Sequence, residues 1–464
     1  MSDRVIVVGG GLAGCEAALQ LARAGHGVTL LEMRPVRGTE AHQSENLGEL
    51  VCTNSFKSVH PKNTHGQLKR EMRALGSVLL DCADETCVPA GSALAVDRQL
   101  FSEAMTRAVV SHLGIDVLRE ESETLPEGPA IVATGPLTSD ALSSAIQGAL
   151  GNEGLAFYDA IAPIVHRDSL DESVVFEAGR FEEDSDYLNC PMTKEEYLVF
   201  INALLEGDVH DGPDWDAVPY FEGCLPVEVM ASRGEDTLRF GPMKPIGLAD
   251  PRSGERPYAV VQLRREDRAG QMWNLVGFQT RLRIGEQKRV FQLIPGLERC
   301  EFLRWGSIHR NAYLNFPACL TPHGSLKERP DLIFAGQLTG VEGYTESAAS
   351  GILAGINLGR ILRGEEPVVP PTTTMLGGLF RYLRDSPPAR FQPMNSNWGL
   401  VDPLNKRVKD KVRKREMLAE RAAADFGAWM EASGIEASGI DVGKIEDPGR
   451  QTTEAPVRAE ASPS

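Results

Sequence analysis

The residues Val7-Val-Gly-Gly-Gly-Leu-Ala-Gly-Cys-Glu16 decide the fold of this chain. They follow a short β-branched run and carry Gly9, Gly11 and Gly14 at the spacing of a turn that joins a strand to a helix. In such a turn the first glycine bends the chain, the second leaves room for a diphosphate, and the third lets the helix approach the strand. A second apolar run, residues 27–31, follows the helical stretch. The start of the chain therefore predicts one strand–helix–strand unit of a parallel sheet.

The glycine turn predicts a dinucleotide site at the start of this helix, where backbone N–H groups face an anion. Glu32 ends the second strand, where a carboxylate accepts hydrogen bonds from both ribose hydroxyls and repels a 2′-phosphate. The predicted binding residues are Gly9, Gly10, Gly11, Leu12, Ala13, Gly14 and Glu32.

Two later strand ends favour FAD over NAD as the bound dinucleotide. Residues 129–135 and 332–336 are short apolar runs that end in glycine, and two further glycines precede a helix after the second run. This combination resembles the second and third segments of flavoproteins with the two-dinucleotide fold, and it places Gly336 beside the cofactor. A second GxGxxG does not occur between residues 150 and 330. Any NAD(P)H is therefore expected to visit the flavin transiently.

The composition excludes several classes of protein. The chain has 464 residues, of which 42% are apolar, and its 48 Lys and Arg against 65 Asp and Glu give a net charge of −17. Such a charge argues against nonspecific binding to nucleic acid or to anionic membranes. No apolar run approaches the ~18 residues needed to span a membrane. The eight cysteines lack the spacing of a disulfide framework or a structural zinc site. We expect a cytoplasmic protein without a metal, and the sequence does not indicate its oligomeric state.

The predicted fold class is α/β, a doubly wound dinucleotide-binding (FAD) fold with an inserted α+β substrate domain. Residues 1–154 are predicted to form the first part of the FAD-binding domain, 155–320 the insertion, and 321–362 the segment that returns to the first sheet. A C-terminal helical region is expected over 363–428 and a disordered tail over 429–464, because the tail repeats Ala-Ser-Gly-Ile and has few large apolar residues.

Two cysteines lie in polar stretches of sequence. Cys52 occurs in Glu49-Leu-Val-Cys-Thr-Asn-Ser-Phe-Lys-Ser58, where this fold is expected to place a flavin ring, and Cys224 occurs in Phe221-Glu-Gly-Cys-Leu-Pro-Val-Glu228. Cys15, by contrast, falls on a helix face and is expected in the core. From the residues alone, Cys52 and Cys224 are either reactive thiols or two unrelated buried ones.

The chain closely resembles the folate- and FAD-dependent tRNA (uracil-5-)-methyltransferases, which are relatives of the glucose-inhibited division protein A family. The resemblance covers residues 4 to about 420. Besides the opening glycine turn, its specific blocks are Cys52-Thr-Asn-Ser-Phe-Lys57, Phe221-Glu-Gly-Cys-Leu-Pro226, Arg239-Phe-Gly-Pro-Met-Lys-Pro-Ile-Gly247, Val276-Gly-Phe-Gln-Thr280, His309-Arg-Asn311 and Gly340-Val-Glu-Gly-Tyr-Thr-Glu346.

The resemblance implies formation of 5-methyluridine at tRNA position 54, in the T-loop. The carbon donor is 5,10-methylenetetrahydrofolate, reduced FAD is the electron source, and NAD(P)H reloads the flavin. Uracil C5 is a poor nucleophile until a group adds to C6, and a thiolate is the side chain best suited to add there reversibly. Following the family, we assign that addition to Cys224 and place Cys52 beside the flavin and the base, where it removes the C5 proton or guards the adduct. The two roles can be exchanged.

The resemblance also implies contacts to the small molecules. His309, Arg310 and Asn311 match a block near folate and flavin, where the imidazole stacks on the pterin and the guanidinium holds the glutamate tail. Tyr344 and Glu346 are expected to approach the isoalloxazine. Around residues 263–270 the chain departs from the family, and we assign no contact there.

A short basic segment predicts tRNA binding in spite of the acidic average. Within ten residues it has seven positive charges against Asp410 alone, namely Lys406, Arg407, Lys409, Lys411, Arg413, Lys414 and Arg415. We expect a basic helix over about 405–421 that binds phosphates and weakens with salt. The alternative is an exposed helix that pairs with acidic neighbours.

Three other functions stay open. A wobble-uridine tRNA modification flavoprotein of the related family requires a longer C-terminus. A small-molecule flavin oxidoreductase does not need the basic helix. A non-enzymatic FAD-binding protein does not need two reactive thiols.

Overall fold

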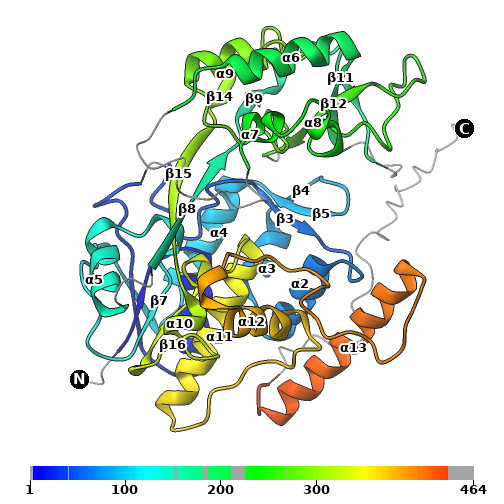
Figure 1. Ribbon diagram of the computed structural model, residues 1–464. Helices are drawn as coiled ribbons and strands as arrows, with labels where there is room; N and C mark the ends of the chain where they lie inside the picture. The colour runs from blue at the N-terminus through cyan, green and yellow to red at the C-terminus, as the bar shows by residue number, and fades with distance from the viewer. Residues whose placement is uncertain are drawn as a thin grey trace, which may run out of the picture.

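The computed structural model describes residues 4–39, 41–150, 154–180, 186–210, 225–267 and 269–436, with 154–161, 307–312 and 390 described by their backbone alone. Figure 1 shows two bodies, a lower one that contains the N-terminal strand and an upper one built mainly from the green segments. Long strands run between the two bodies.

The lower body contains the predicted parallel sheet. Its strands lie in the order β16 (Ser325–Leu326), β17 (Arg329–Phe334), β7 (Ala130–Val132), β1 (Val5–Val8), β2 (Val28–Leu31) and β6 (Ile115–Leu118). Every neighbouring pair is parallel except β16 with β17. The short apolar strands are buried, as a sheet covered on both faces requires. The predicted fold class is confirmed.

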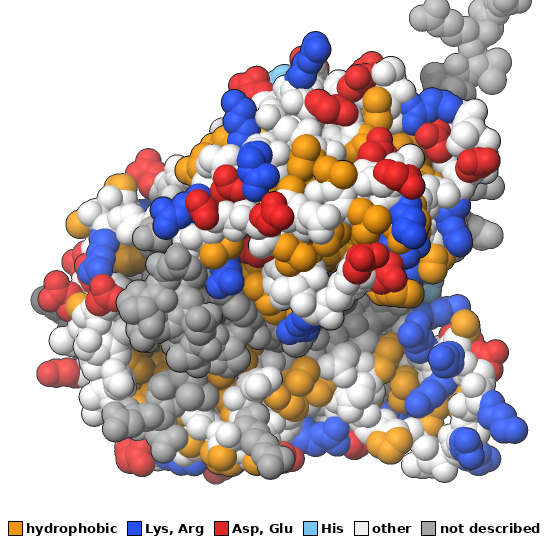
Figure 2. Space-filling view, turned by 45° about the horizontal axis from the view of Figure 1, so that its top comes forward, with side chains coloured by type: hydrophobic (Ala, Val, Ile, Leu, Met, Phe, Trp, Pro, Cys, Tyr) orange, Lys and Arg blue, Asp and Glu red, His pale blue; other side chains and the backbone are white. Residues whose placement is uncertain are grey.

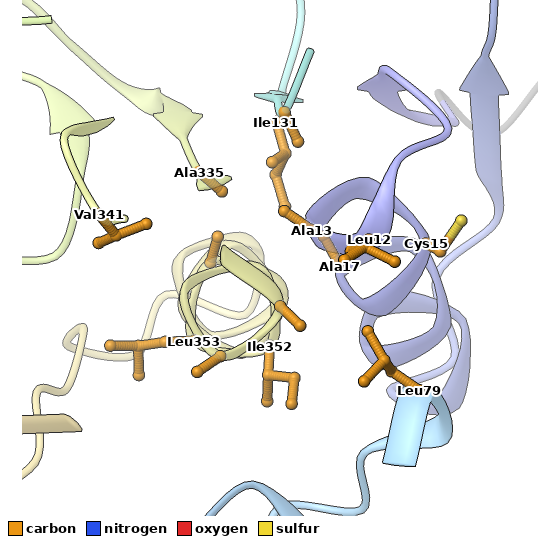
Figure 3. Packing of buried hydrophobic residues seen from close by; sticks show 14 of the residues in the cluster. Leu12, Ala13, Cys15, Ala17, Leu79, Ile131, Ala335, Val341, Ile352 and Leu353 are labelled. Atoms are coloured by element: carbon orange, nitrogen blue, oxygen red, sulfur yellow. The ribbon is translucent and has the colours of Figure 1, made fainter. Parts of the chain in front are cut away.

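Two helices pack together beside this sheet because both carry small residues at the contact. They are α1 (Leu12–Arg23) and α11 (Tyr344–Leu362). A Cβ atom at Gly351 would lie 2.2 Å from the carbonyl oxygen of Ala13, and one at Gly355 would lie 2.8 Å from that of Ala17. Figure 3 shows Ala13 and Ala17 of α1 beside Ile352 of α11. This close approach brings the N-termini of both helices to the same region as the glycine turn.

A three-stranded sheet and further helices complete the lower body. The sheet has the order β3 (Ser55–Ser58), β5 (Ala93–Val96) and β4 (Cys87–Val88). The helices are α2 (Thr64–Ala74), α3 (Val78–Glu85), α4 (Arg98–Val110), α5 (Asp140–Leu150), α10 (Phe316–Cys319) and α12 (Met375–Asp385). Single 3-10 turns are η1 (Gly135–Leu137), η5 (Gly336–Thr339) and η6 (Pro388–Arg390).

The upper body has its own antiparallel sheet and its own core. The strand order is β10 (Phe176–Glu177), β11 (Tyr187–Met192), β12 (Ala259–Arg265), β13 (Met272–Leu275), β9 (Ile164–His166) and β14 (Phe302–Arg304). The helices are α6 (Lys194–Glu206), α7 (Val227–Ser232), α8 (Thr237–Phe240) and α9 (Ile284–Phe291), with the 3-10 turn η3 (Arg167–Ser169). Its buried residues form a cluster separate from the core of the lower body.

The two bodies are joined by one antiparallel ribbon. Strand β8 (Gly154–Ile161) enters the upper body and β15 (Ser307–Leu314) leaves it, and the two pair along their whole length. The predicted boundary at 155 falls inside β8, and the boundary at 320 falls shortly after β15.

The basic helix differs from its predicted bounds. Helix α13 spans Lys411–Ala432, whereas we expected a helix over about 405–421 and a disordered tail from 429. It begins at Lys411 because the carboxylate of Asp410 accepts a hydrogen bond from the N–H of Arg413 at 2.7 Å. It continues to Ala432 because apolar residues at helical spacing, including Phe426 and Met430, are buried. The rest of the predicted tail, residues 437–464, lies outside the described residues.

Two kinds of feature are absent from the described ranges. None of the helices described is long and apolar enough to cross a membrane. Across the same residues, His, Cys, Asp and Glu side chains do not gather in groups of three or more that could hold a metal ion.

Candidate functional site

The glycine turn leaves open space for an anion at the start of α1. Gly9 has φ +101°, and a Cβ there would lie 2.7 Å from the carbonyl oxygen of Ala133. A Cβ at Gly14 would lie 1.8 Å from the carbonyl oxygen of Gly9, whereas one at Gly11 would meet no atom within 4 Å. No side chain caps the first turn of α1, so its backbone N–H groups remain available to a ligand. The turn therefore fits a dinucleotide diphosphate.

Glu32 lies beside this turn and is held in its ionised form. Its Oε2 accepts a hydrogen bond from the N–H of Gly10 at 2.9 Å, and its Oε1 accepts from the backbone N–H and Nε of Arg34 at 3.0 and 2.8 Å. Burial acts to raise the pKa of Glu32, but these contacts outweigh it and lower the pKa. The carboxylate also lines a pocket with the glycine turn and with Met33, His42, Glu120, Ser122, Thr134, Thr138 and Ser139.

The other predicted residues of the turn lie where the helices meet. Leu12 and Ala13 are buried in the first turn of α1. Gly336, with φ +76°, donates its N–H to the hydroxyl of Ser350 at 2.7 Å, and a Cβ there would lie 3.0 Å from the Cβ of Ala13. Gly336 therefore lies next to α1, although it is far from it in sequence.

Cys52 lies in a loop before β3 and contacts the start of α11. The N–H groups of Cys52 and Thr53 donate to the phenol oxygen of Tyr344 at 2.7 and 3.0 Å. Burial raises the pKa of Tyr344, so its phenol is neutral. Cys52 itself is partly exposed. The structure thus brings together two predicted site residues from opposite ends of the sequence.

Glu346 is buried in the first turn of α11 and is ionised. Its Oε1 accepts from the N–H of Ser396 at 3.0 Å and lies 3.3 Å from Nδ1 of His65. Burial alone would raise the pKa of this carboxyl, but His65, the positive charge of Lys57 and the Ser396 N–H lower it to about 2.

Lys69 lies close to this carboxylate and fixes the end of β3. Its Nζ donates to the carbonyl oxygens of Ser58 and His65 at 3.1 and 3.3 Å and also to that of Phe56. Lys57, which has a left-handed φ of +62°, lies between the acceptor residues Phe56 and Ser58.

The structure does not describe the side chains of some predicted site residues. Cys224 and most of its block lie outside the described residues, so its position relative to Cys52 is not given. The backbone of His309, Arg310 and Asn311 runs in β15, paired with residues 157–159 of β8, while their side chains are outside the description.

Three arginines around Cys52 were not predicted, and we call them the arginine cluster: Arg98 of α4, Arg264 of β12 and Arg304 of β14. Arg98 donates to the carbonyl oxygens of Leu50 and Cys52 at 2.8 and 3.1 Å.

The two arginines from the upper body bind the same loop. Arg304 donates to the carbonyl oxygen of Val51 at 3.0 Å. Arg264 donates to Oδ1 of Asn54 at 3.0 Å and to the hydroxyl of Thr53. No local pattern marks these arginines, although Arg264 lies in the segment where the chain departs from the family.

The basic segment is exposed on the lower body. All seven Lys and Arg side chains predicted to bind RNA are exposed. Arg413 pairs with Glu416 at 3.1 Å, and Glu416 also binds Lys62 of the neighbouring loop at 2.6 Å. Figure 2 shows Lys and Arg side chains gathered at the lower right, on the side where Figure 1 places α13. Arg413 also lies 3.7 Å from Glu420, so the ion pairs of the described residues compensate only a small part of the positive charge of this segment.

Comparison with known proteins identifies the family. The model of the glucose inhibited division protein A family matches residues 4–366. The methylenetetrahydrofolate--tRNA-(uracil-5-)-methyltransferase TrmFO of Geobacter sulfurreducens is 53% identical over 433 residues, which are 93% of this chain and 99% of that protein. The protein of the same name from Moorella thermoacetica is 52% identical over 94% of this chain and 100% of its own length.

A solved structure shows the same fold at low sequence identity. The GidA structure of Aquifex aeolicus in its form II crystal has a TM-score of 0.67 and 17% identity, and the match covers 92% of this chain and 73% of that one. Together with the full-length relatives, this places the chain in the glucose-inhibited division protein A family and, within it, among the methylenetetrahydrofolate--tRNA-(uracil-5-)-methyltransferases.

Proposed function

We propose that this chain methylates C5 of the T-loop uridine of tRNA, with 5,10-methylenetetrahydrofolate as carbon donor and FAD as bound cofactor. The observation that carries the proposal is the match over almost the whole length to relatives that bear this activity in their names. The alternatives of a wobble-uridine modifier and a small-molecule oxidoreductase lack such a match among these relatives.

The residues of the lower body support FAD binding. Gly11 leaves space at the uncapped start of α1 for the diphosphate, and the ionised Glu32 lines the adjacent pocket for the adenosine end. Reduced FAD, when bound, supplies the two electrons that turn a methylene group into a methyl group, and NAD(P)H restores the reduced form.

Two cysteines act on the uracil ring in this proposal. Cys224 adds to C6, which makes C5 nucleophilic, and leaves again when the product forms. Cys52 accepts the proton that C5 loses. The N–H groups of Cys52 and Thr53 both donate to Tyr344, so the backbone that carries the thiol is fixed relative to the start of α11.

The exposed basic segment supports binding of tRNA phosphates. The side chains of Lys406, Arg407, Lys409, Lys411 and Lys414 are exposed and have no ion pair within the parts of the chain that are described. Chemistry at a base inside folded RNA requires that base to leave its stack and enter a pocket, and phosphate contacts position the RNA for this step.

The test is mass spectrometry of nucleosides from an unmodified tRNA transcript. The transcript is incubated with the protein, NADPH and methylenetetrahydrofolate labelled at the transferred carbon, with a Cys224→Ala variant as the control. We expect labelled 5-methyluridine with the unchanged protein and none with the variant. Reduction of the flavin without modification of the tRNA contradicts the proposal and favours a small-molecule oxidoreductase.

A further inference from the structure

The loop that carries Cys52 is held by positive charges from both bodies of the molecule. Arg98 reaches it from the lower body, and Arg264 and Arg304 reach it from the upper one. Between them, these side chains bind the carbonyl oxygens of Leu50, Val51 and Cys52. Three carbonyl groups in sequence are thus fixed, so the backbone of the loop has little freedom.

The charges of the arginine cluster are only partly compensated. Arg98 forms an ion pair with Glu266, whose other oxygen accepts from Nδ2 of Asn274 at 2.6 Å. Among the described residues, Arg264 and Arg304 have no carboxylate within ion-pair distance. Both are partly buried, and an uncompensated charge in such a place is unfavourable.

Cys52 can add negative charge beside that of Glu266. Burial lowers the pKa of Arg264 and Arg304, and negative charge on Glu266 and on the Cys52 thiol acts against that shift at both arginines. The same charge also favours the ionised form of Arg98. The attraction is mutual, because a cation that is stabilised by a thiolate stabilises that thiolate equally.

The remaining groups that face Cys52 do not reverse this balance. Tyr344 is neutral and uses its oxygen to accept the two N–H groups of the loop. Glu266, which follows β12, is engaged by Arg98 and Asn274. Among the residues that the structure describes, three guanidinium groups and one carboxylate therefore lie around the loop of Cys52.

We propose that the arginine cluster keeps a substantial fraction of the Cys52 thiol ionised at neutral pH and holds it in the position from which it accepts the C5 proton of uracil. The second part rests on the proposed function. In that step the C5–H bond breaks, the proton forms an S–H bond at Cys52, and the electron pair stays in the pyrimidine ring. Arg264 and Arg304 are positioning residues, since they act on the substrate through Cys52.

The first part is tested by alkylation of the reduced holoenzyme with iodoacetamide in the absence of tRNA. The rate at which the peptide containing Cys52 is modified is measured by mass spectrometry across a series of pH values. We expect a midpoint at about pH 7.5 or lower, at least one unit below the ~8.5 of an ordinary cysteine. A midpoint at or above ~8.5 overturns the proposal.

Variants identify the arginines as the cause. Arg304→Gln keeps hydrogen-bond donors but removes the charge, and it should raise the midpoint by about one pH unit, which slows alkylation at pH 7 by roughly tenfold. Arg304→Lys, which keeps the charge, should restore the lower midpoint. Arg264→Gln and Arg264→Lys repeat the comparison if the first pair does not fold.

Arg329→Gln is the matched control. Arg329 also binds backbone carbonyl oxygens, those of Pro126, Glu127 and Gly128, but it lies away from Cys52. Its loss should leave the midpoint unchanged. An equal shift in Arg329→Gln and Arg304→Gln, or no shift in Arg304→Gln and Arg264→Gln, contradicts the proposal.

The role of the thiolate in the reaction is measured separately. If the proposed function holds, the acidic limb of the pH profile of kcat/KM should move upward in Arg304→Gln by the same amount as the alkylation midpoint. If alkylation shows the low midpoint and no 5-methyluridine forms, the ionised thiol stands and the proposed function fails. If 5-methyluridine forms and the alkylation midpoint is ordinary, the function stands and this inference fails.

Discussion

Two cysteines close together in sequence lie in regions of opposite charge. Cys15 is fully buried in the first turn of α1 and donates its S–H to the carbonyl oxygen of Gly10 at 3.3 Å. Burial raises its pKa, and the nearby carboxylates of Glu32 and Glu16 raise it further. Cys52 is partly exposed and is surrounded by three arginines. Burial and nearby carboxylates thus favour the neutral thiol at Cys15, whereas positive side chains surround the loop of Cys52.

Two buried glutamates show the same contrast. Glu16, next to Cys15, accepts from the N–H of Leu79 at the start of α3 at 2.9 Å, and burial raises its pKa to about 7. Glu346, near Cys52, has a pKa of about 2 because of His65, Lys57 and Ser396. In a chain of net charge −17, positive side chains thus lie near Glu346 and the loop of Cys52, whereas Cys15 lies near carboxylates.

The largest effect should come from the backbone around Cys15. Gly14→Ala places a Cβ within 1.8 Å of the carbonyl oxygen of Gly9, so α1 must move away from the turn. We expect loss of bound FAD and a free energy of unfolding lower by ~3 kcal/mol or more. Flavin absorbance and urea denaturation measure both. Gly11→Ala is the control, because a Cβ there meets no protein atom: it should fold normally and lose only FAD affinity.

The next largest effect should come from the Cys52 side chain, whose loss should lower activity without changing the backbone. Cys52→Ala is expected to lower the rate of 5-methyluridine formation by ~100-fold or more, since it removes the proton acceptor, while leaving FAD binding intact. Cys15→Ala should retain activity within a few-fold. Nucleoside mass spectrometry measures both variants. Equal losses of activity in the two would break the comparison.

The two glutamates should give opposite pH dependence of stability. Glu346 has a pKa below its ordinary value of 4.5, so its stabilising contribution is present above about pH 4.5 and is lost as the pH falls towards 2. Glu16 has a raised pKa, so its contribution is present below pH 4.5 and is lost as the pH rises through 7.

Urea denaturation of Glu346→Gln and Glu16→Gln beside the unchanged protein tests these signs. The stability advantage of the unchanged protein over Glu346→Gln should grow from pH 3 to pH 5. Its advantage over Glu16→Gln should shrink from pH 5 to pH 8, by on the order of 2 kcal/mol. If the stability differences from Glu346→Gln and from Glu16→Gln change with pH in the same direction, the surroundings of the two glutamates do not differ in the way described.

The smallest effect should be that of Cys15→Ala on stability. The variant loses one buried sulfur atom and one weak hydrogen bond, so we expect a free energy of unfolding lower by about 1 kcal/mol. Differential scanning calorimetry of the holoenzyme measures it. Arg329→Gln, which loses exposed and partly buried contacts to carbonyl groups, provides a second site for comparison.

Features that depend on residues close together in the chain could be predicted from the sequence. The glycine turn, the parallel sheet and the burial of Cys15 all follow from spacing within one short stretch, and the structure confirms the fold. The arginine cluster could not be predicted in this way, because Arg98, Arg264 and Arg304 come from three separate elements that meet only after the two bodies pack.

The predicted start and end of the basic helix were wrong for a different reason. The basic residues near Lys411 suggested a helix centred on the charge, but a helix is set by its cap and its buried face. Asp410 caps the helix, which therefore starts later than predicted. The burial of Phe426 and Met430 extends the helix into the stretch that we expected to be disordered.

The ribbon of β8 and β15 also has a consequence for changes in the length of the chain. Gly154, where the chain leaves the lower body, is paired with Leu314, where it returns. A tight hairpin between these neighbours closes the parent sheet without disturbing its strand order. The chain therefore enters and leaves the upper body at one pair of neighbouring residues, so a change in the length of that segment need not alter the strand order of the parallel sheet.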